Sequence, residues 1–403
     1  MKILVISAQP PSPYSGGEIR LLNLLKHLST GHEFTVLAPV HSIDNPALDF
    51  ADKYCRFIPV LLEAPPSHSK LYWQLNAWRQ AFINPKPVHA MSFYSPLVQQ
   101  AIDNLQNKEH FDVVQVQQLM MAQYLPDGID TPCILDVDNL WSKLYLENYD
   151  ISSERSLVQR VQKWLDRKKI YIYEKAQIRK FTACLAITPQ DEYYIHSLVQ
   201  QAITAVVPNG VDTEYFSPQP SSNEEASILV FTGTMSWEPN VDAVKYFVGE
   251  ILPLIQKENP GVTFQIVGRD PTPEVLELDR YPGVKVTGFV EDVRPYLTAC
   301  NVYVVPMRYG AGTRLKILEA LAMGKAVVST IIGAEGLTVN DGEHLLLSDD
   351  ITSFTSKTIS LLDNSLLRAQ LGENGRLLVN ASYSWTQIAA KLDNLYYTII
   401  NLN

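Results

Sequence analysis

The stretch GAGTRLKILEALAMGKAVVST (residues 310–330) joins a glycine-rich turn, a helix and a valine-rich strand. Arg314 and Lys316 fall in the expected first turn of the helix, where backbone N–H groups have no partner within the helix. Cations at this end oppose the helix dipole. A bound anion would reconcile the two, because exposed amides and positive side chains would converge on it. The stretch predicts a phosphate-binding turn in an α/β fold.

Strand-length apolar runs alternate with helix-period segments along the whole chain. Continuous apolar strands are typical of parallel sheets that helices cover on both faces, so we predict two doubly wound, Rossmann-like domains. The expected strands are 2–8, 34–40, 112–117, 133–138 and 184–188 in the first half, and 228–234, 263–268, 284–288, 302–307, 326–330 and 344–348 in the second.

The domain boundary is expected near residue 205, ahead of a segment with three prolines, an Asn-Gly turn and an acidic, serine-rich patch (residues 206–227). This gives a first domain at 1–205 and a second at 206–383. The final stretch, 384–403, is aromatic and too apolar for a free tail. We expect it to pack back on the first domain.

Composition narrows the class of protein. The 403-residue chain is 46% hydrophobic and carries a net charge of −10, which argues against nucleic acid as a partner. The four cysteines form no CxxC pair and the histidines show no metal-ligand spacing, so buried free thiols and no metal are expected. The start does not read as a signal peptide, and no run approaches the ~20 apolar residues of a membrane span. We expect a cytoplasmic protein.

Ligands of parallel sheets bind beyond the carboxyl ends of the strands. In the second half, Gly233 and Thr234, Gly268 with Arg269, and the backbone near Val290 follow such ends. If the helix of the 310–330 stretch begins near Thr313, Lys316 and Glu319 share one face, which suits a diphosphate and a ribose. The alternative is an ordinary i,i+3 salt bridge.

In the first half, Gly16-Gly17 opens a helix after the first strand, and Asp138 ends the fourth. The glycines suit the close approach of an anion or sugar, or form a plain turn. Asp138 suits a sugar or acceptor, or caps the next turn, and the residues leave these two open.

These motifs carry a resemblance. The 310–330 stretch, together with VPNGVDTEYFSP, GTMSWEPNVDA, IVGRDP and VTGFVEDVRPYLTACNVYVVP, resembles the nucleotide-sugar half of retaining glycosyltransferases of the GT-B fold, in the large family-4 group. SGGEIRLLNLLKHLSTGHEFTVLAP resembles the first domain of that family. The resemblance implies two Rossmann-like domains that face each other across a cleft.

What the resemblance implies falls on particular residues. Glu319 would hold the ribose, and Arg314 and Lys316 would meet the diphosphate as catalytic residues together with Asp138. Gly16-Gly17 would face donor and acceptor. The candidate nucleotide-sugar-binding set is Gly16, Gly17, Gly233, Thr234, Arg269, Val290, Gly312, Thr313, Leu315 and Glu319.

Three positions depart from the family pattern. Ala311 stands where an earlier glutamate of an E-x7-E pair is usual, and Asp138-Asn139 where a histidine is often found. Trp237 and Asn240 follow the Gly233 turn, where the family usually has an arginine and a lysine.

The predicted function is a metal-independent, retaining glycosyltransferase of hexosyltransferase type. It would use a nucleoside-diphosphate sugar, with UDP-sugar favoured over GDP-sugar, no cofactor, and a small-molecule, lipid-linked or glycan acceptor. A nucleotide-sugar epimerase and a catalytically silent nucleotide-sugar-binding protein are the alternatives. The basic segment 152–181 either contacts the inner face of a membrane peripherally or is a solvated helix face.

Overall fold

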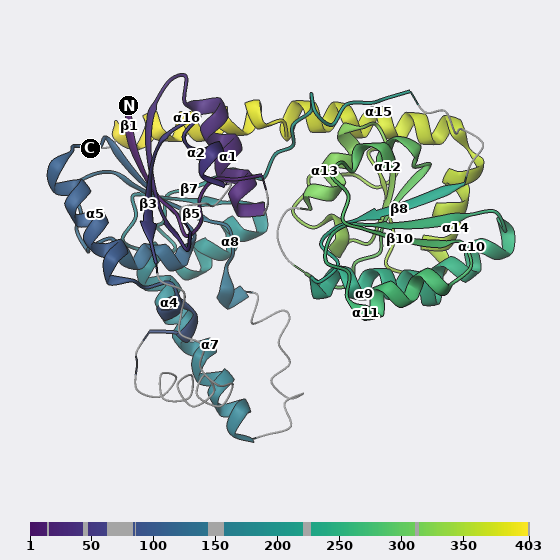
Figure 1. The fold of residues 1–403 in the computed structure, drawn as a ribbon, viewed down its shortest axis with the longest axis horizontal. Helices are drawn as coiled ribbons and strands as arrows, with labels where there is room; N and C mark the ends of the chain where they lie inside the picture. The colour runs from purple at the N-terminus through teal and green to yellow at the C-terminus, as the bar shows by residue number, and fades with distance from the viewer. Residues whose placement is uncertain are drawn as a thin grey trace. The chain divides into compact units, whose positions relative to one another are not determined.

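The computed structural model describes residues 1–13, 16–42, 47–62, 84, 86–143, 157–220, 227–310 and 314–401. It divides into two compact units, one made of residues 1–208 and 388–403 and the other of residues 209–387 (Figure 1). The division after Pro208 lies close to the predicted boundary at 205.

The first unit is built on a parallel sheet in the order β3-β2-β1-β4-β5-β6-β7. All of its strand pairs are parallel. The strands are β1 (Lys2–Ile6), β2 (Glu33–Val40), β3 (Arg56–Leu61), β4 (Val113–Gln117), β5 (Cys133–Val137), β6 (Ala183–Ala186) and β7 (Thr204–Val206). The helices are α1 (Gly16–Leu28), α2 (Ala47–Ala51), α4 (Val88–Ser92), α5 (Pro96–Lys108), the 3₁₀ turn η1 (Leu119–Tyr124), α7 (Leu157–Ile178), α8 (Pro189–Leu198) and α16 (Trp385–Ile400).

Helices cover both faces of this sheet. One core cluster joins side chains of β1, β4 and β5 to those of α5, η1, α7 and α8. The opposite face carries Gln115 and Asp136, which bond Tyr396 of α16 and Arg20 of α1. A sheet buried on both faces explains why its central strands are mostly apolar and why polar residues such as Gln115 and Asp136 are hydrogen-bonded.

The sequence analysis missed β3 and β7, and these are the two edge strands of the sheet. Neither is continuously buried, because an edge strand has a neighbour on one side only. Pro59 lies within β3, which an edge strand tolerates and a central strand does not. The criterion of an unbroken apolar run therefore could not find them.

The second unit repeats the plan with a sheet in the order β10-β9-β8-β11-β12-β13, again with all strand pairs parallel. Its strands are β8 (Ile228–Thr232), β9 (Thr263–Val267), β10 (Val284–Gly288), β11 (Val302–Val305), β12 (Ala326–Ser329) and β13 (Leu346–Leu347). Its helices are α9 (Glu238–Tyr246), the π-helical η3 (Phe247–Ile251), α10 (Leu252–Glu258), α11 (Pro273–Leu276), the 3₁₀ turn η4 (Glu277–Arg280), α12 (Arg294–Ala299), α13 (Leu315–Ala322), the 3₁₀ turn η5 (Ile332–Ala334), α14 (Ile351–Asp363) and α15 (Ser365–Ser382). The prediction of two doubly wound, parallel-sheet units is confirmed.

The last helix, α16, starts in the second unit, and its residues from Ile388 onward belong to the first. The Tyr396 hydroxyl bonds the Gln115 side chain, and Asp393 lies 2.6 Å from Nε2 of the buried His32. These polar contacts add to the burial of its apolar face, which includes Ile388, Leu392 and Ile399. Across the described residues, no helix has the length and apolar character needed to cross a membrane.

Candidate active site

Each sheet has one place where the chain reverses the direction in which strands are added. In the second unit this lies between β8 and β11, and in the first between β1 and β4. Ligands of open α/β sheets bind at such a switch point, beyond the carboxyl ends of the strands. The residues that follow β8 and β11 are therefore the first to examine.

Lys316 of α13 lies at the switch point of the second unit. Its Nζ donates a hydrogen bond of 2.8 Å to Oδ1 of Asn240 and sits 3.8 Å from the centroid of the Phe231 ring. Burial lowers the pKa of Lys316 well below its ordinary value, and the charge of Arg314 acts in the same direction. An ammonium held in this way is stabilised when an anion binds beside it.

Asn240, in the first turns of α9, holds this ammonium in place. The side chain is buried, and its Nδ2 donates to the carbonyl of Thr234 at 2.9 Å while Oδ1 accepts from Lys316. The sequence analysis noted Asn240 only as a departure from the family pattern. Its position in the first turn after the Gly233 loop was the signal that could have placed it in the site.

Glycines shape the floor of this site. A Cβ added at Gly233 would lie 2.7 Å from Nδ2 of Asn240 and 3.0 Å from Nζ of Lys316. A Cβ at Gly268 would lie 1.7 Å from the Gly233 carbonyl oxygen, so the loops after β8 and β9 touch through two glycines. The exposed Arg269 follows, with its Nε 3.5 Å from Oγ1 of Thr234.

Glu319 lies one turn beyond Lys316 on α13. Burial raises the pKa of Glu319 to about 7, and the charge of Lys316 opposes that shift. Within the described part of the chain the Glu319 side chain forms no ion pair or hydrogen bond, so the i,i+3 salt bridge with Lys316 is not formed. A half-buried carboxylate without a protein partner is suited to accept hydrogen bonds from a ligand.

The helix starts later than predicted. We expected it near residue 313 with Arg314 in the first turn, but α13 begins at Leu315 and Arg314 is the residue before it. The Arg314 side chain is buried, and its Nη2 lies 3.4 Å from the carbonyl of Ile332. A Cβ at Gly310 would approach that guanidinium to 3.2 Å, which explains the glycine. Burial lowers the pKa of Arg314.

The remaining predicted residues of this unit divide into two groups. Leu315 and Val290 are half-buried and pack against the core, and Val290 follows β10 at the edge of the sheet. Ala311, Gly312 and Thr313 lie outside the described residues.

Asp138 follows β5 in the first unit and faces the start of α1. A Cβ added at Gly17 would lie 3.8 Å from Oδ2 of Asp138 and 3.5 Å from Nε2 of Gln118, whereas Gly16 has open space around it. Gln118 follows β4 with a φ of 72°, an uncommon conformation for a residue with a side chain. Gly17, Gln118 and Asp138 line a cavity of about 10 Å³, which is roughly the volume that one water needs.

The environment of Asp138 disfavours its charge. Burial raises its pKa to about 7, and the neighbouring Asp136 carboxylate adds to the shift. The charge of Arg20 and hydrogen bonds from the Gln118 side chain and the Asn139 backbone act in the opposite direction. Asp138 is therefore suited to exchange a proton near neutral pH.

A buried ion pair between Arg20 and Asp136 lies close to Asp138. Arg20 of α1 holds Asp136 through Nε–Oδ2 and Nη2–Oδ1 contacts of 2.9 and 3.1 Å, and its Nη1 donates to the carbonyl of Pro208 at 2.9 Å. Both side chains are almost fully buried. The sequence analysis did not find this pair, and no local pattern joins residues that lie 116 positions apart.

The described residues contain no group of three or more histidine, cysteine, aspartate or glutamate side chains that could hold a metal ion.

Comparisons with known proteins agree with this geometry. Residues 226–364, which lie in the second unit, match the family described as Glycosyl transferases group 1. A human protein, one of the subunits of phosphatidylinositol N-acetylglucosaminyltransferase, is 25% identical over 223 residues, 53% of this chain and 45% of that protein. The phosphatidyl-myo-inositol mannosyltransferase of Mycolicibacterium smegmatis is 27% identical over 202 residues, 48% of this chain and 51% of that protein. The chain spans about half the length of these curated relatives.

Solved structures show the same fold over the whole chain. A sucrose-phosphate synthase from Thermosynechococcus elongatus superimposes with a TM-score of 0.74 at 18% identity, covering 100% of both chains. HepE of Anabaena, crystallised with UDP, gives 0.68 at 14% identity and covers 99% of this chain and 100% of its own. The two-domain GT-B architecture is therefore shared.

Proposed function

We propose that this chain transfers a sugar from a nucleoside-diphosphate sugar to an acceptor. The proposal starts from the match between the second unit and the glycosyl transferases group 1 family. The observation that carries the proposal is the cluster of Gly233, Asn240, Lys316 and Glu319 at the β8–β11 switch point. It combines a glycine floor, an oriented ammonium and a carboxylate without a protein partner among the described residues.

Lys316 is proposed to bind the diphosphate. As the bond between sugar and diphosphate breaks, negative charge grows on the leaving group, and a fixed cation stabilises that charge without reorganising. The Asn240 hydrogen bond fixes the ammonium before the ligand arrives. Because Arg314 is buried beside the same helix start, it adds to the positive potential there.

Glu319 is proposed to hold the ribose. Its carboxylate lies one helical turn from the Lys316 ammonium. The two neighbouring hydroxyls of a ribose can donate hydrogen bonds to a carboxylate that has no other partner. Gly233 leaves room for the donor beside the strand end. Asp138 is proposed to serve the sugar or the acceptor through its carboxyl group.

Several finer points belong to the proposal. Transfer with retention and without a divalent metal follows the family resemblance, with the cations taking the place of a metal. UDP is the favoured nucleotide, supported by the solved HepE structures with UDP and with UDP-glucose, although a relative from Corynebacterium glutamicum is described as GDP-mannose-dependent. A lipid-linked acceptor is supported by relatives that are named for phosphatidylinositol substrates.

The experiment is a donor panel. UDP-glucose, UDP-N-acetylglucosamine and GDP-mannose are incubated with the protein and a lipid-linked or glycan acceptor, and released nucleoside diphosphate is measured. Acceptor-dependent release from one donor supports the proposal. Conversion of the donor sugar without release would indicate an epimerase, and binding without turnover would indicate a silent protein. The variant Lys245→Ala changes a lysine outside the proposed site and should behave like the wild-type protein in this panel, because that lysine pairs with Glu274 on the exposed side of α9.

A further inference from the structure

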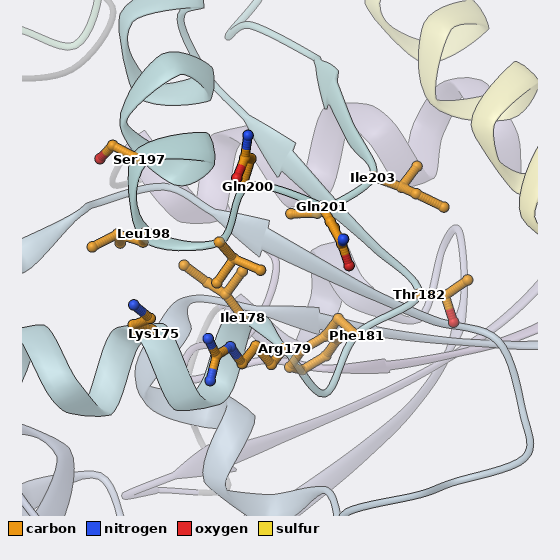
Figure 2. Close-up of a pocket in the computed structure, with 12 residues that line it drawn as sticks. Lys175, Ile178, Arg179, Phe181, Thr182, Ser197, Leu198, Gln200, Gln201 and Ile203 are labelled. Atoms are coloured by element: carbon orange, nitrogen blue, oxygen red, sulfur yellow. The ribbon is translucent and has the colours of Figure 1, made fainter.

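A separate pocket of about 770 Å³ opens on the first unit (Figure 2). It is formed by the last turns of α7, the start of β6, the end of α8 and the segment 199–203 that leads into β7. It therefore lies where β6 and β7 begin, whereas Asp138 follows the carboxyl end of β5. In a parallel sheet these are opposite edges, so the pocket is distinct from the candidate active site.

Two cations line this pocket without partners among the described residues. Lys175 lies in the last turn of α7 and Arg179 is the first residue after that helix, and both side chains line the pocket (Figure 2). Cations near a helix end commonly bond its last carbonyls. In the part of the chain that the structure describes, however, neither side chain forms a hydrogen bond or an ion pair. The adjacent Lys180 differs, because its Nζ lies 2.9 Å from Oδ1 of Asp127.

The other walls supply groups that suit a sugar. Gln200 and Gln201 follow α8, and their amides likewise have no hydrogen-bond partner in the described part of the chain. Amides bind hydroxyl groups as both donors and acceptors. Phe181 and Ala202 give the pocket an apolar floor that packs against the core of the unit. The size of the pocket, about 770 Å³, falls in the usual range of small-molecule sites.

We propose that this pocket binds an anionic sugar, meaning a sugar that carries a phosphate or carboxylate group. Lys175 and Arg179 bind the anionic group, Gln200 and Gln201 bind hydroxyls, and the apolar floor contacts the ring. The site would hold a charged saccharide at the edge of the first sheet opposite Asp138. The proposed transfer reaction does not require this second site.

A lipid surface is the competing ligand. The same helix exposes Trp164, Tyr171 and Ile172, and aromatic side chains among lysines are common at membrane interfaces. The two cations, however, line a concave pocket together with Gln200 and Gln201, whereas a bilayer presents an extended surface. The geometry favours a discrete soluble ligand.

Calorimetry with glucose 6-phosphate tests the proposal. Glucose is the neutral control, and saturating UDP keeps the phosphate away from the nucleotide site. We expect saturable binding of glucose 6-phosphate, at least tenfold tighter than that of glucose. The double substitution Lys175→Ala with Arg179→Ala should weaken binding by about tenfold or more, the scale of losing charged hydrogen bonds. Lys180→Ala should leave it within about twofold, because that lysine is already paired.

Three results would overturn the proposal. One is the absence of saturable glucose 6-phosphate binding in the wild-type protein. Another is an equal loss in Lys180→Ala, which would indicate general charge attraction. The third comes from vesicles of phosphatidylglycerol: if these bind through Lys175 and Arg179 while glucose 6-phosphate does not, the ligand is a lipid surface. Unchanged UDP affinity in the double variant verifies that the fold and the nucleotide site are intact.

Discussion

Replacing Lys316 with methionine should separate catalysis from stability. Methionine keeps an unbranched stem over the Phe231 ring but removes the ammonium that lies 3.8 Å from its centroid and 2.8 Å from Asn240. If the ammonium stabilises the leaving diphosphate, turnover should fall by about 10²–10³-fold, which corresponds to about 2.7–4 kcal/mol of transition-state stabilisation.

The same substitution should leave the ligand-free protein at least as stable. The lost hydrogen bond and ring contact each contribute on the order of 1 kcal/mol. The burial of the ammonium opposes these two contributions. The lowered pKa of Lys316 indicates that its surroundings disfavour the charged form overall. A lysine whose pKa is lower in the folded state destabilises that state; the cost is full below the lowered pKa and declines as pH rises from that value to the ordinary lysine pKa. Removing the charge removes this cost at neutral pH.

The assay pairs nucleoside diphosphate release with thermal unfolding, each with and without UDP. We expect low turnover, an unchanged or higher Tm without ligand, and a smaller rise of Tm on adding UDP, because the variant binds the diphosphate less tightly. Turnover within a few-fold of wild type would refute the role of Lys316. A drop in Tm that parallels the loss of activity would show that the ammonium is structural.

Four further predictions address the rest of the molecule. Glu319→Ala should weaken UDP binding by about 1–3 kcal/mol in calorimetry. Because the pKa of Glu319 is about 7, the affinity of the wild-type protein for UDP-glucose should rise with pH through that value, relative to the affinity of Glu319→Gln. Parallel pH profiles of the two proteins would contradict the assignment. Asp138→Asn should preserve UDP affinity and lower turnover, whereas wild-type turnover would make that carboxyl group structural. Arg20→Met should lower the free energy of unfolding by about 3–5 kcal/mol in urea titrations, since it leaves Asp136 buried and unpaired; a change below about 1 kcal/mol would contradict a stabilising role of the ion pair. Activity should survive chelation with EDTA, and a loss that magnesium or manganese restores would disprove metal independence.

The central part of both sheets could be predicted from the sequence because burial on two faces leaves a local mark. Strands such as β1, β5, β8 and β12 are predominantly apolar and almost fully buried, and glycine turns follow some of them. The edge strands β3 and β7 bury less and lacked that mark. Lys316 and Glu319 were assigned to one face because the helical period fixes which residues share a face, even though α13 starts two residues later than expected.

The sequence by itself thus determined the two parallel sheets, the strand ends that carry the candidate site and the face shared by Lys316 and Glu319. Tertiary structure decided which side chains meet there. Asn240 reaches Lys316 across 76 positions, and Arg20 reaches Asp136 across 116. Local patterns report only the burial and period of one element, whereas these contacts depend on how separate elements pack on a sheet. For the same reason, the fixed ammonium and the raised pKa of Asp138 became visible only in the folded chain.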